Sequence, residues 1–169
     1  NLIANASLSN DIKIDLIKCL ATNGGINGMI IGQAIDCYFE NQRLELNQLE
    51  FLHIHKTARL IAASLKMGAI ICEYDLEIQN KLYNFGIDLG LLFQIQDDII
   101  DETQSSEEAG KTTQNDGSKN SFVNLLGLEG AVKSADELAL KCTNTLNTFD
   151  LNLKESLEEL LLKYINRHK

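Results

Sequence analysis

The stretch Phe93-Gln94-Ile95-Gln96-Asp97-Asp98-Ile99-Ile100-Asp101 decides the fold class, because it sets three aspartates in an apolar segment with helical spacing. Aspartate is a poor helix former, and aspartates one turn apart repel each other. We therefore expect a cation from outside the chain, most simply a metal ion, to offset their charge.

On a helix the polar residues of this stretch project into one broad stripe, and Asp97 lies one turn from Asp101. Mg²⁺ takes oxygen ligands, keeps several waters and commonly uses one or two carboxylates together with substrate phosphates. The pattern predicts that Asp97, Asp98 and Asp101 bind Mg²⁺ and that diphosphate oxygens complete its coordination.

Two other interpretations of the aspartates are open. A solvated acidic patch near a helix end is the first, but the isoleucines and leucines around the aspartates indicate a buried helix, where such a patch is uncommon without partners. An acid pair of a glycosidase is the second. It fits less well, because carboxylates one turn apart occupy the same side of any substrate.

Outward from this stretch, the chain predicts an all-α fold. Proline is absent, apolar residues recur at three- and four-residue spacing, and alternating strand patterns are missing.

Asn47, with Glu50 three residues on, is expected to cap the longest early helix. Gly86 and Gly90 are expected to let a neighbouring helix or a ligand approach closely. We expect one domain over residues 1–169, with helices at about 10–23, 26–41, 47–72, 75–101, 121–128, 129–149 and 151–166, and a polar loop at 102–120 over the mouth of a site.

Composition limits the partners. The net charge of −9 argues against binding to a nucleic-acid backbone. No apolar run approaches the roughly 18 residues that a membrane span needs, and the start lacks a secretion signal, so we expect no stable membrane insertion and a cytoplasmic location. The four cysteines, at 19, 37, 72 and 142, show no zinc-ligand spacing and are interpreted as reduced packing residues.

Two segments that contain lysine supply the positive charges that binding a diphosphate requires. His55-Lys56-Thr57 combines a positive charge with a hydroxyl on a helix, and Gly110-Lys111 places a second lysine after the aspartates. Each lysine alone is more often a surface charge, but with the aspartates they form a coherent anion site.

Together these segments resemble the C-terminal part of the trans-isoprenyl diphosphate synthase family, which includes the bacterial farnesyl and geranylgeranyl diphosphate synthases. The resemblance covers the whole chain and keeps the order of the motifs. The matching segments are Gly28–Asp36, His55–Thr57, Phe93–Asp101, Gly110-Lys111 with Lys119 and Phe122–Gly127, and the basic end Tyr164–Lys169.

The resemblance implies a helical bundle of the isoprenoid synthase type and a Mg²⁺-dependent transfer that joins an allylic diphosphate to isopentenyl diphosphate. The product would be a short-chain isoprenyl diphosphate such as farnesyl or geranylgeranyl diphosphate, and the assembly a homodimer. By similarity, Asp97, Asp98 and Asp101 hold the metal, and Lys56 and Lys111 are the catalytic cations. The residues implied to bind or line the substrates are Lys56, Thr57, Gln94, Lys111, Lys119, Gln33 and Asp36, with Arg167 or Lys169 near the isopentenyl diphosphate.

The chain also departs from the family pattern. The first aspartate-rich motif, the arginines after it, and the lysine, arginine and histidine that hold isopentenyl diphosphate are not in this sequence. We therefore expect the chain to be inactive alone. Three explanations are open: it is part of a longer enzyme, it is one of two chains that assemble, or it is a degenerate descendant. The alternative is a non-catalytic helical subunit or interaction partner of a prenyltransferase. A terpene cyclase fits less well, because its Asn, Ser and Glu metal motif has no convincing copy here.

Overall fold

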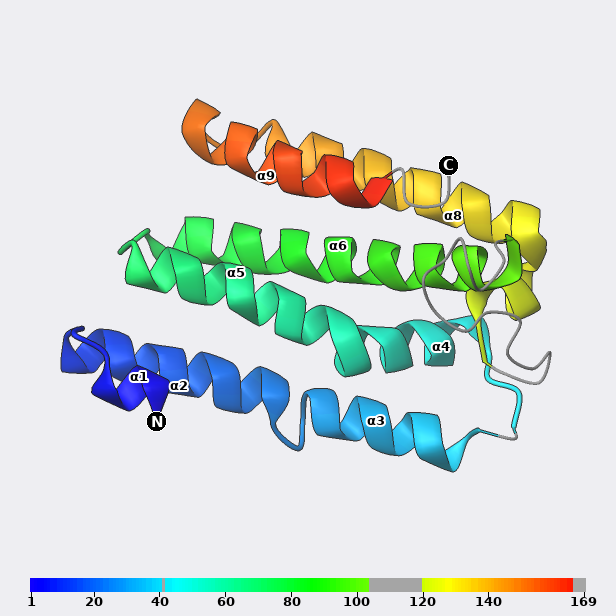
Figure 1. Ribbon diagram of the computed structural model, residues 1–169, viewed down its shortest axis with the longest axis horizontal. Coiled ribbons are helices and arrows are strands. Elements are labelled where there is room, and N and C mark those ends of the chain that lie inside the picture. The colour runs from blue at the N-terminus through cyan, green and yellow to red at the C-terminus, as the bar shows by residue number, and fades with distance from the viewer. Residues whose placement is uncertain (41, 104–119, 166–169) are drawn as a thin grey trace.

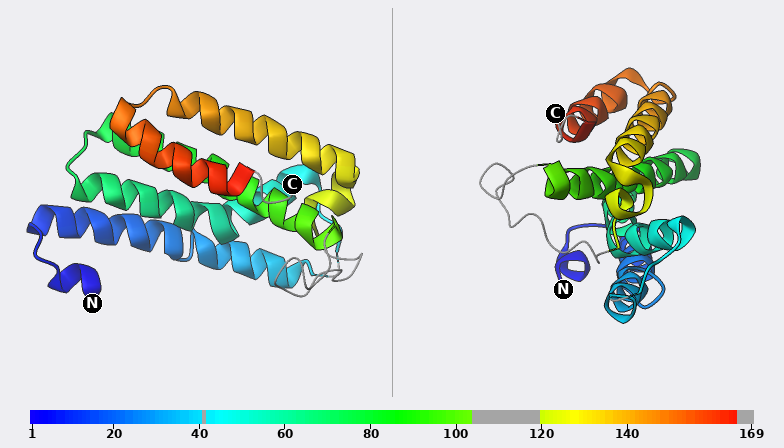
Figure 2. Two further views of the ribbon diagram at one scale, coloured as in Figure 1. Left: turned by 45° about the horizontal axis from the view of Figure 1, so that its top comes forward. Right: turned by 90° about the vertical axis from the view of Figure 1, so that its right-hand side faces the viewer.

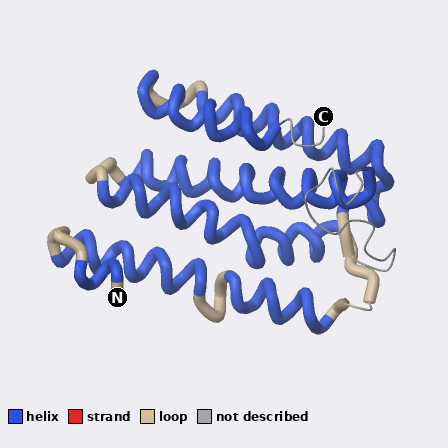
Figure 3. Tube along the Cα trace, in the orientation of Figure 1, coloured by secondary structure: helices blue, strands red, loops and turns tan. Residues whose placement is uncertain are grey.

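The computed structural model describes residues 1–40, 42–103 and 120–165, and its regular elements in these ranges are helical (Figures 1 and 3). The all-α prediction is confirmed. The helices are α1 (Leu2–Asn5), α2 (Asn10–Gly24), α3 (Met29–Tyr38), α4 (Leu46–His53), the π-helix η1 (Ile54–Ala58), α5 (Arg59–Ile71), α6 (Leu76–Thr103), α8 (Phe122–Leu146) and α9 (Leu151–Ile165). Over the described residues, no helix combines the length and hydrophobicity that crossing a bilayer requires.

The long helix α6 lies at the centre of the bundle. It packs against α5 on one side and α8 on the other, while α2 covers α5, α3 covers η1 and α9 lies on α8 (Figures 1 and 2). The helices run roughly along the long axis of the molecule. The last turns of α3 and α6 and the first turns of α4 and α8 therefore gather at one end of the bundle.

The contact between α6 and the η1–α5 segment is unusually close, and two glycines make it possible. A Cβ built at Gly86 would lie 2.4 Å from Ala62 Cα, and one built at Gly90 would lie 2.5 Å from Ala58 Cα. Backbones can approach this closely only where both helices carry small residues. The prediction for Gly86 and Gly90 is confirmed, and the neighbour that approaches is a helix.

The main core surrounds α6 and is built from its inward face together with α8 and α9. Phe85, Leu92 and Phe122 are almost completely buried in it. Cys19 and Cys142 are buried free thiols, whereas Cys37 and Cys72 are exposed, so the interpretation of all four as packing residues is wrong for two of them. Cys37 lies on the outer side of α3, and Cys72 follows the last residue of α5.

Helix boundaries differ from the predictions where local hydrogen bonds intervene. The fourth helix is capped by Glu45 and not by Asn47, because Glu45 and Gln48 form a reciprocal capping box. The predicted helix 47–72 contains the π-helical turn η1, and the predicted helix 26–41 is the shorter α3. The predicted break near residue 128 lies at Gly127, whose φ of 72° interrupts α8. Most of the predicted polar loop, residues 104–119, lies outside the described residues.

Candidate active site

The aspartates lie on the last turns of α6, where their surroundings differ. Asp97 and Asp101 are half-buried, whereas Asp98 is only 7 % exposed. One carboxylate oxygen of Asp98, Oδ2, accepts the backbone N–H of Phe122 at 2.8 Å, at the start of α8. A carboxylate at a helix N-terminus is stabilised by the unpaired N–H groups and the helix dipole. Part of the charge that we expected an external cation to offset is therefore offset within the chain.

The carboxylates of this site suit Mg²⁺ better than a metal ion whose ligands all come from protein side chains. Among the described residues, no group of three or more His, Cys, Asp or Glu side chains is arranged to hold a metal ion. Two half-buried carboxylates one turn apart, Asp97 and Asp101, match the way in which Mg²⁺ is held by a few carboxylates and by the phosphates of a substrate. The metal role of Asp97, Asp98 and Asp101 stays a prediction.

Lys56 and Asp36, which the sequence assigned to two separate segments, meet in the structure. Lys56 Nζ lies 2.5 Å from Asp36 Oδ2, and the two side chains are 34 % and 37 % exposed. Lys56 and Thr57 belong to η1, and π-helical turns are rare and occur frequently at functional sites. The pair therefore joins α3 to the turn that presents Lys56.

Gln94 is held by a histidine that the sequence analysis did not single out. His53, only 7 % exposed at the end of α4, has its Nδ1 3.0 Å from Gln94 Oε1, and its ring stacks on that of Phe122 with 5.5 Å between centroids. With Oε1 as the acceptor and Nδ1 as the donor of this contact, the amide Nε2 of Gln94 is its remaining hydrogen-bond donor. His53 thus connects α4, α6 and α8. Its sequence signal is weak, since a lone histidine carries no spacing pattern.

The remaining predicted residues are less closely joined. Gln33 is exposed on α3 and donates to Cys37 Sγ at 3.3 Å, so within the described residues its side-chain hydrogen bond goes neither to Asp36 nor to Lys56. Thr57 is half-buried beside Lys56. Lys111, Lys119, Arg167 and Lys169 lie outside the described residues, and their roles stay predictions.

Asn120 is a second residue that the sequence analysis missed. Its amide donates to the carbonyl oxygens of Phe39 at 3.0 Å and Gln42 at 2.9 Å, and its Oδ1 accepts the N–H of Leu44 at 2.9 Å. These bonds fasten the α3–α4 connection to the residues that precede α8. They hold the end of α3 next to the starts of α4 and α8.

Comparison with known proteins decides the family. The sequence model described as polyprenyl synthetase matches residues 3–160. The chain belongs to the polyprenyl synthetase family. This confirms the resemblance to isoprenyl diphosphate synthases.

Relatives of this polyprenyl synthetase chain include two bacterial enzymes. It is 37 % identical to the farnesyl diphosphate synthase of Micrococcus luteus, over 99 % of this chain and 58 % of that protein. It is 33 % identical to the farnesyl diphosphate synthase of Haemophilus influenzae, over 96 % of this chain and 57 % of that protein. The chain spans somewhat more than half the length of these relatives.

Solved structures agree with this assignment. The geranyltransferase from Helicobacter pylori complexed with magnesium and isoprenyl diphosphate superposes with a TM-score of 0.87 and 52 % identity, covering 96 % of this chain and 55 % of that one. The helical bundle of the isoprenoid synthase type that we expected is thereby confirmed for this member of the polyprenyl synthetase family.

Proposed function

We propose that this chain is the C-terminal part of an isoprenyl diphosphate synthase, which joins an allylic diphosphate to isopentenyl diphosphate and makes a short-chain product such as farnesyl or geranylgeranyl diphosphate. The observation that carries the proposal is the gathering of the α6 aspartates, the Lys56–Asp36 pair and the His53-held Gln94 at one end of a polyprenyl synthetase bundle. The named relatives, which include farnesyl diphosphate synthases and a geranyltransferase, support it.

The chemistry requires stabilisation of negative charge. As the allylic C–O bond breaks, charge builds on the departing diphosphate, and cations fixed near it lower the barrier. In our proposal Lys56 and Lys111 provide two of these charges, while Gln94 and Thr57 donate hydrogen bonds that orient the diphosphate. Asp97 and Asp101, with Asp98 beside them, hold Mg²⁺, which when bound neutralises diphosphate oxygens.

The magnesium role is tested by titrating inorganic diphosphate into the chain with and without Mg²⁺ in a calorimeter. We expect Asp97→Ala to weaken the Mg²⁺-dependent binding by roughly tenfold or more, because one carboxylate ligand is lost. Asp136→Ala, which removes an exposed carboxylate on α8, is the matched control and should bind as the parent does. Unaltered binding by the Asp97 variant would reject the metal role.

We also propose that this chain alone does not turn over substrate, because the first aspartate motif of the family is not in its sequence. The test is to incubate the purified chain with labelled isopentenyl diphosphate, an allylic diphosphate and Mg²⁺. Product formed by the chain alone would contradict the proposal. A non-catalytic subunit would show neither turnover nor Mg²⁺-dependent diphosphate binding. The homodimer stays a prediction, which sedimentation velocity tests.

A further inference from the structure

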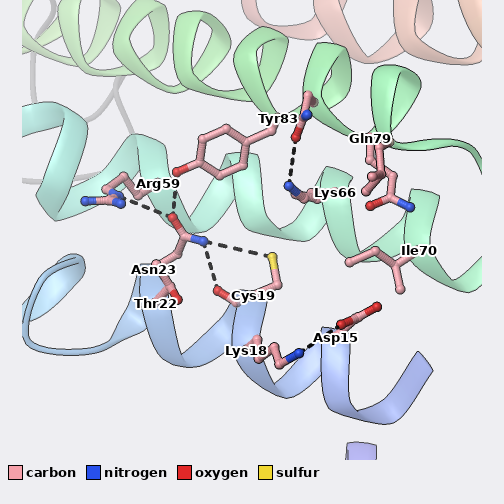
Figure 4. Close-up of a pocket in the computed structure, with 12 residues that line it drawn as sticks. Asp15, Lys18, Cys19, Thr22, Asn23, Arg59, Lys66, Ile70, Gln79 and Tyr83 are labelled. Carbon is pink, nitrogen blue, oxygen red and sulfur yellow. Dashed lines mark hydrogen bonds and ion pairs between the residues drawn. The ribbon is translucent and has the colours of Figure 1, made fainter. Parts of the chain in front are cut away.

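A second pocket lies between α2, α5 and α6, away from the aspartates. Its volume is about 450 Å³, within the size range of small-molecule sites. Figure 4 shows Cys19 and Asn23 reaching it from α2, Arg59 and Lys66 from α5, and Tyr83 from α6. Tyr83 precedes Asp97 by 14 residues on one helix, which corresponds to about 21 Å along its axis. The α6 side of the pocket is therefore separate from the aspartates, and its α5 side begins at Arg59, three residues after Lys56.

The charge of the pocket is opposite to that of the chain. Three positive side chains and one negative side chain line it, although the whole chain carries a net charge of −9. Lys18 pairs with Asp15 at 3.5 Å, but neither Arg59 nor Lys66 forms an ion pair with a carboxylate of the described residues. The pocket thus contains two positive charges without a negative partner in the described part of the chain.

Neutral oxygens from three segments hold these two cations in place. Arg59 donates to Asn23 Oδ1 at 3.2 Å and to the carbonyl oxygen of Asn27 at 2.7 Å, and Lys66 donates to Asn80 Oδ1 at 2.9 Å. The ammonium group of Lys66 also lies 5.7 Å from the centroid of the Tyr83 ring. Because these partners are uncharged, they fix both side chains without cancelling their charge. N–H donors remain on both groups for a ligand.

A buried asparagine, Asn23, forms the wall between the two cations. Asn23 is only 4 % exposed, and its amide accepts from the Tyr83 hydroxyl at 2.6 Å and donates to the Cys19 carbonyl oxygen at 2.9 Å. Burial raises the pKa of the Cys19 thiol, while the positive charge of Lys66 and the Asn23 hydrogen bond oppose that rise. Lys66 therefore acts electrostatically on the interior of this pocket.

We propose that the pocket binds a small phosphate-bearing anion, held by Lys66 and Arg59 with Lys18 at its mouth. Half-buried charges without counter-charges cost free energy, and an anion of more than one charge removes that cost for both cations at once. Guanidinium and ammonium groups together provide several donors for phosphate oxygens, which suits a phosphate better than a single carboxylate. The site needs no metal and is independent of the proposed synthase function.

The test is a titration of inorganic phosphate, without Mg²⁺, into the isotope-labelled chain, followed by the NMR shifts of backbone amides. We expect saturable shifts around Asn23, Lys66 and Tyr83, together with a rise in the melting temperature of the chain. Lys66→Gln should weaken binding by roughly tenfold, because a charge-assisted hydrogen bond is lost. Lys133→Gln removes the same charge from an exposed position on α8 and should leave the affinity unchanged.

Two further variants locate the binding. Lys56→Gln removes the cation of η1, three residues before Arg59. Lys56 does not line the pocket, so this change should not affect phosphate binding here. Lys18→Gln changes a side chain that is 71 % exposed, and it should weaken phosphate binding slightly even if the Lys66 variant is unstable. Absence of saturable shifts would overturn the proposal, and so would binding that depends on Lys56 but on neither Lys66 nor Lys18.

Discussion

Gly32 of α3 lies directly against the backbone of Lys56, so that a Cβ built at residue 32 would be 2.2 Å from the Lys56 nitrogen. This close approach brings Asp36, one turn further along α3, to the Lys56 ammonium group. The glycine and the lysine are 24 positions apart in the sequence. The position of the proposed catalytic cation thus depends on the absence of a side chain in another helix.

Gly32→Ala should destabilise the chain by about 1–3 kcal/mol, because its methyl group collides with backbone atoms that cannot rotate away. Urea unfolding monitored by circular dichroism measures the loss. Gly68→Ala is the matched control, since Gly68 lies within α5 and has nothing within 4 Å of an added Cβ. It should leave stability unchanged or raise it by up to about 1 kcal/mol. Equal effects of the two substitutions would contradict the close packing of α3 on η1.

Asp98→Ala should cost about 1–3 kcal/mol of unfolding free energy, because the buried N–H of Phe122 loses its acceptor at the start of α8. Asp97→Ala, at a half-buried neighbouring position, should cost less. Asp98→Asn keeps an oxygen acceptor and should recover part of the loss. Thermal and urea unfolding of the three variants compare these effects. A larger loss for Asp97→Ala would show that Asp98 has no special structural role.

The Lys56–Asp36 ion pair should contribute little to stability, since both side chains are about one third exposed and solvent screens their attraction. Lys56→Met and Asp36→Asn are each expected to change the free energy of unfolding by less than about 1 kcal/mol. Leu49→Ala, at a completely buried position, should by contrast cost about 2–5 kcal/mol. A loss of several kcal/mol on removing Lys56 would mean that this lysine is kept for folding.

The cysteines should separate into two reactivity classes at pH 8. Burial raises the pKa of the Cys142 thiol to about 12, so almost no reactive thiolate forms there, and Cys19 is also buried. Cys37 and Cys72 are exposed and should react with a thiol reagent first. Rapid modification of all four thiols in the folded chain would contradict the buried positions of Cys19 and Cys142.

The raised pKa of Cys142 also predicts a pH dependence of stability. The unfolded thiol titrates near its ordinary value of 9.0, whereas the folded one stays protonated up to about 12. Deprotonation therefore favours the unfolded chain, so this contribution to stability is complete below pH 9 and declines as the pH rises from 9 toward 12. The difference in unfolding free energy between the parent and Cys142→Ala should shrink over that range. A constant difference would contradict the raised pKa.

The sequence alone determined the all-α fold, the helix that carries the aspartates and the two glycines of its close contact, because these follow from local periodicity, the absence of proline and the lack of a side chain. The family also followed from motif order. Tertiary structure alone decided the π-helical turn at Lys56, the attachment of Gln94 to His53 and the use of Asp98 to cap α8. The two hydrogen bonds join residues on different helices, and no spacing along one helix reports which atoms of another helix lie beside it. The π-helical turn inserts one extra residue per turn into a segment whose apolar spacing predicts an ordinary α-helix.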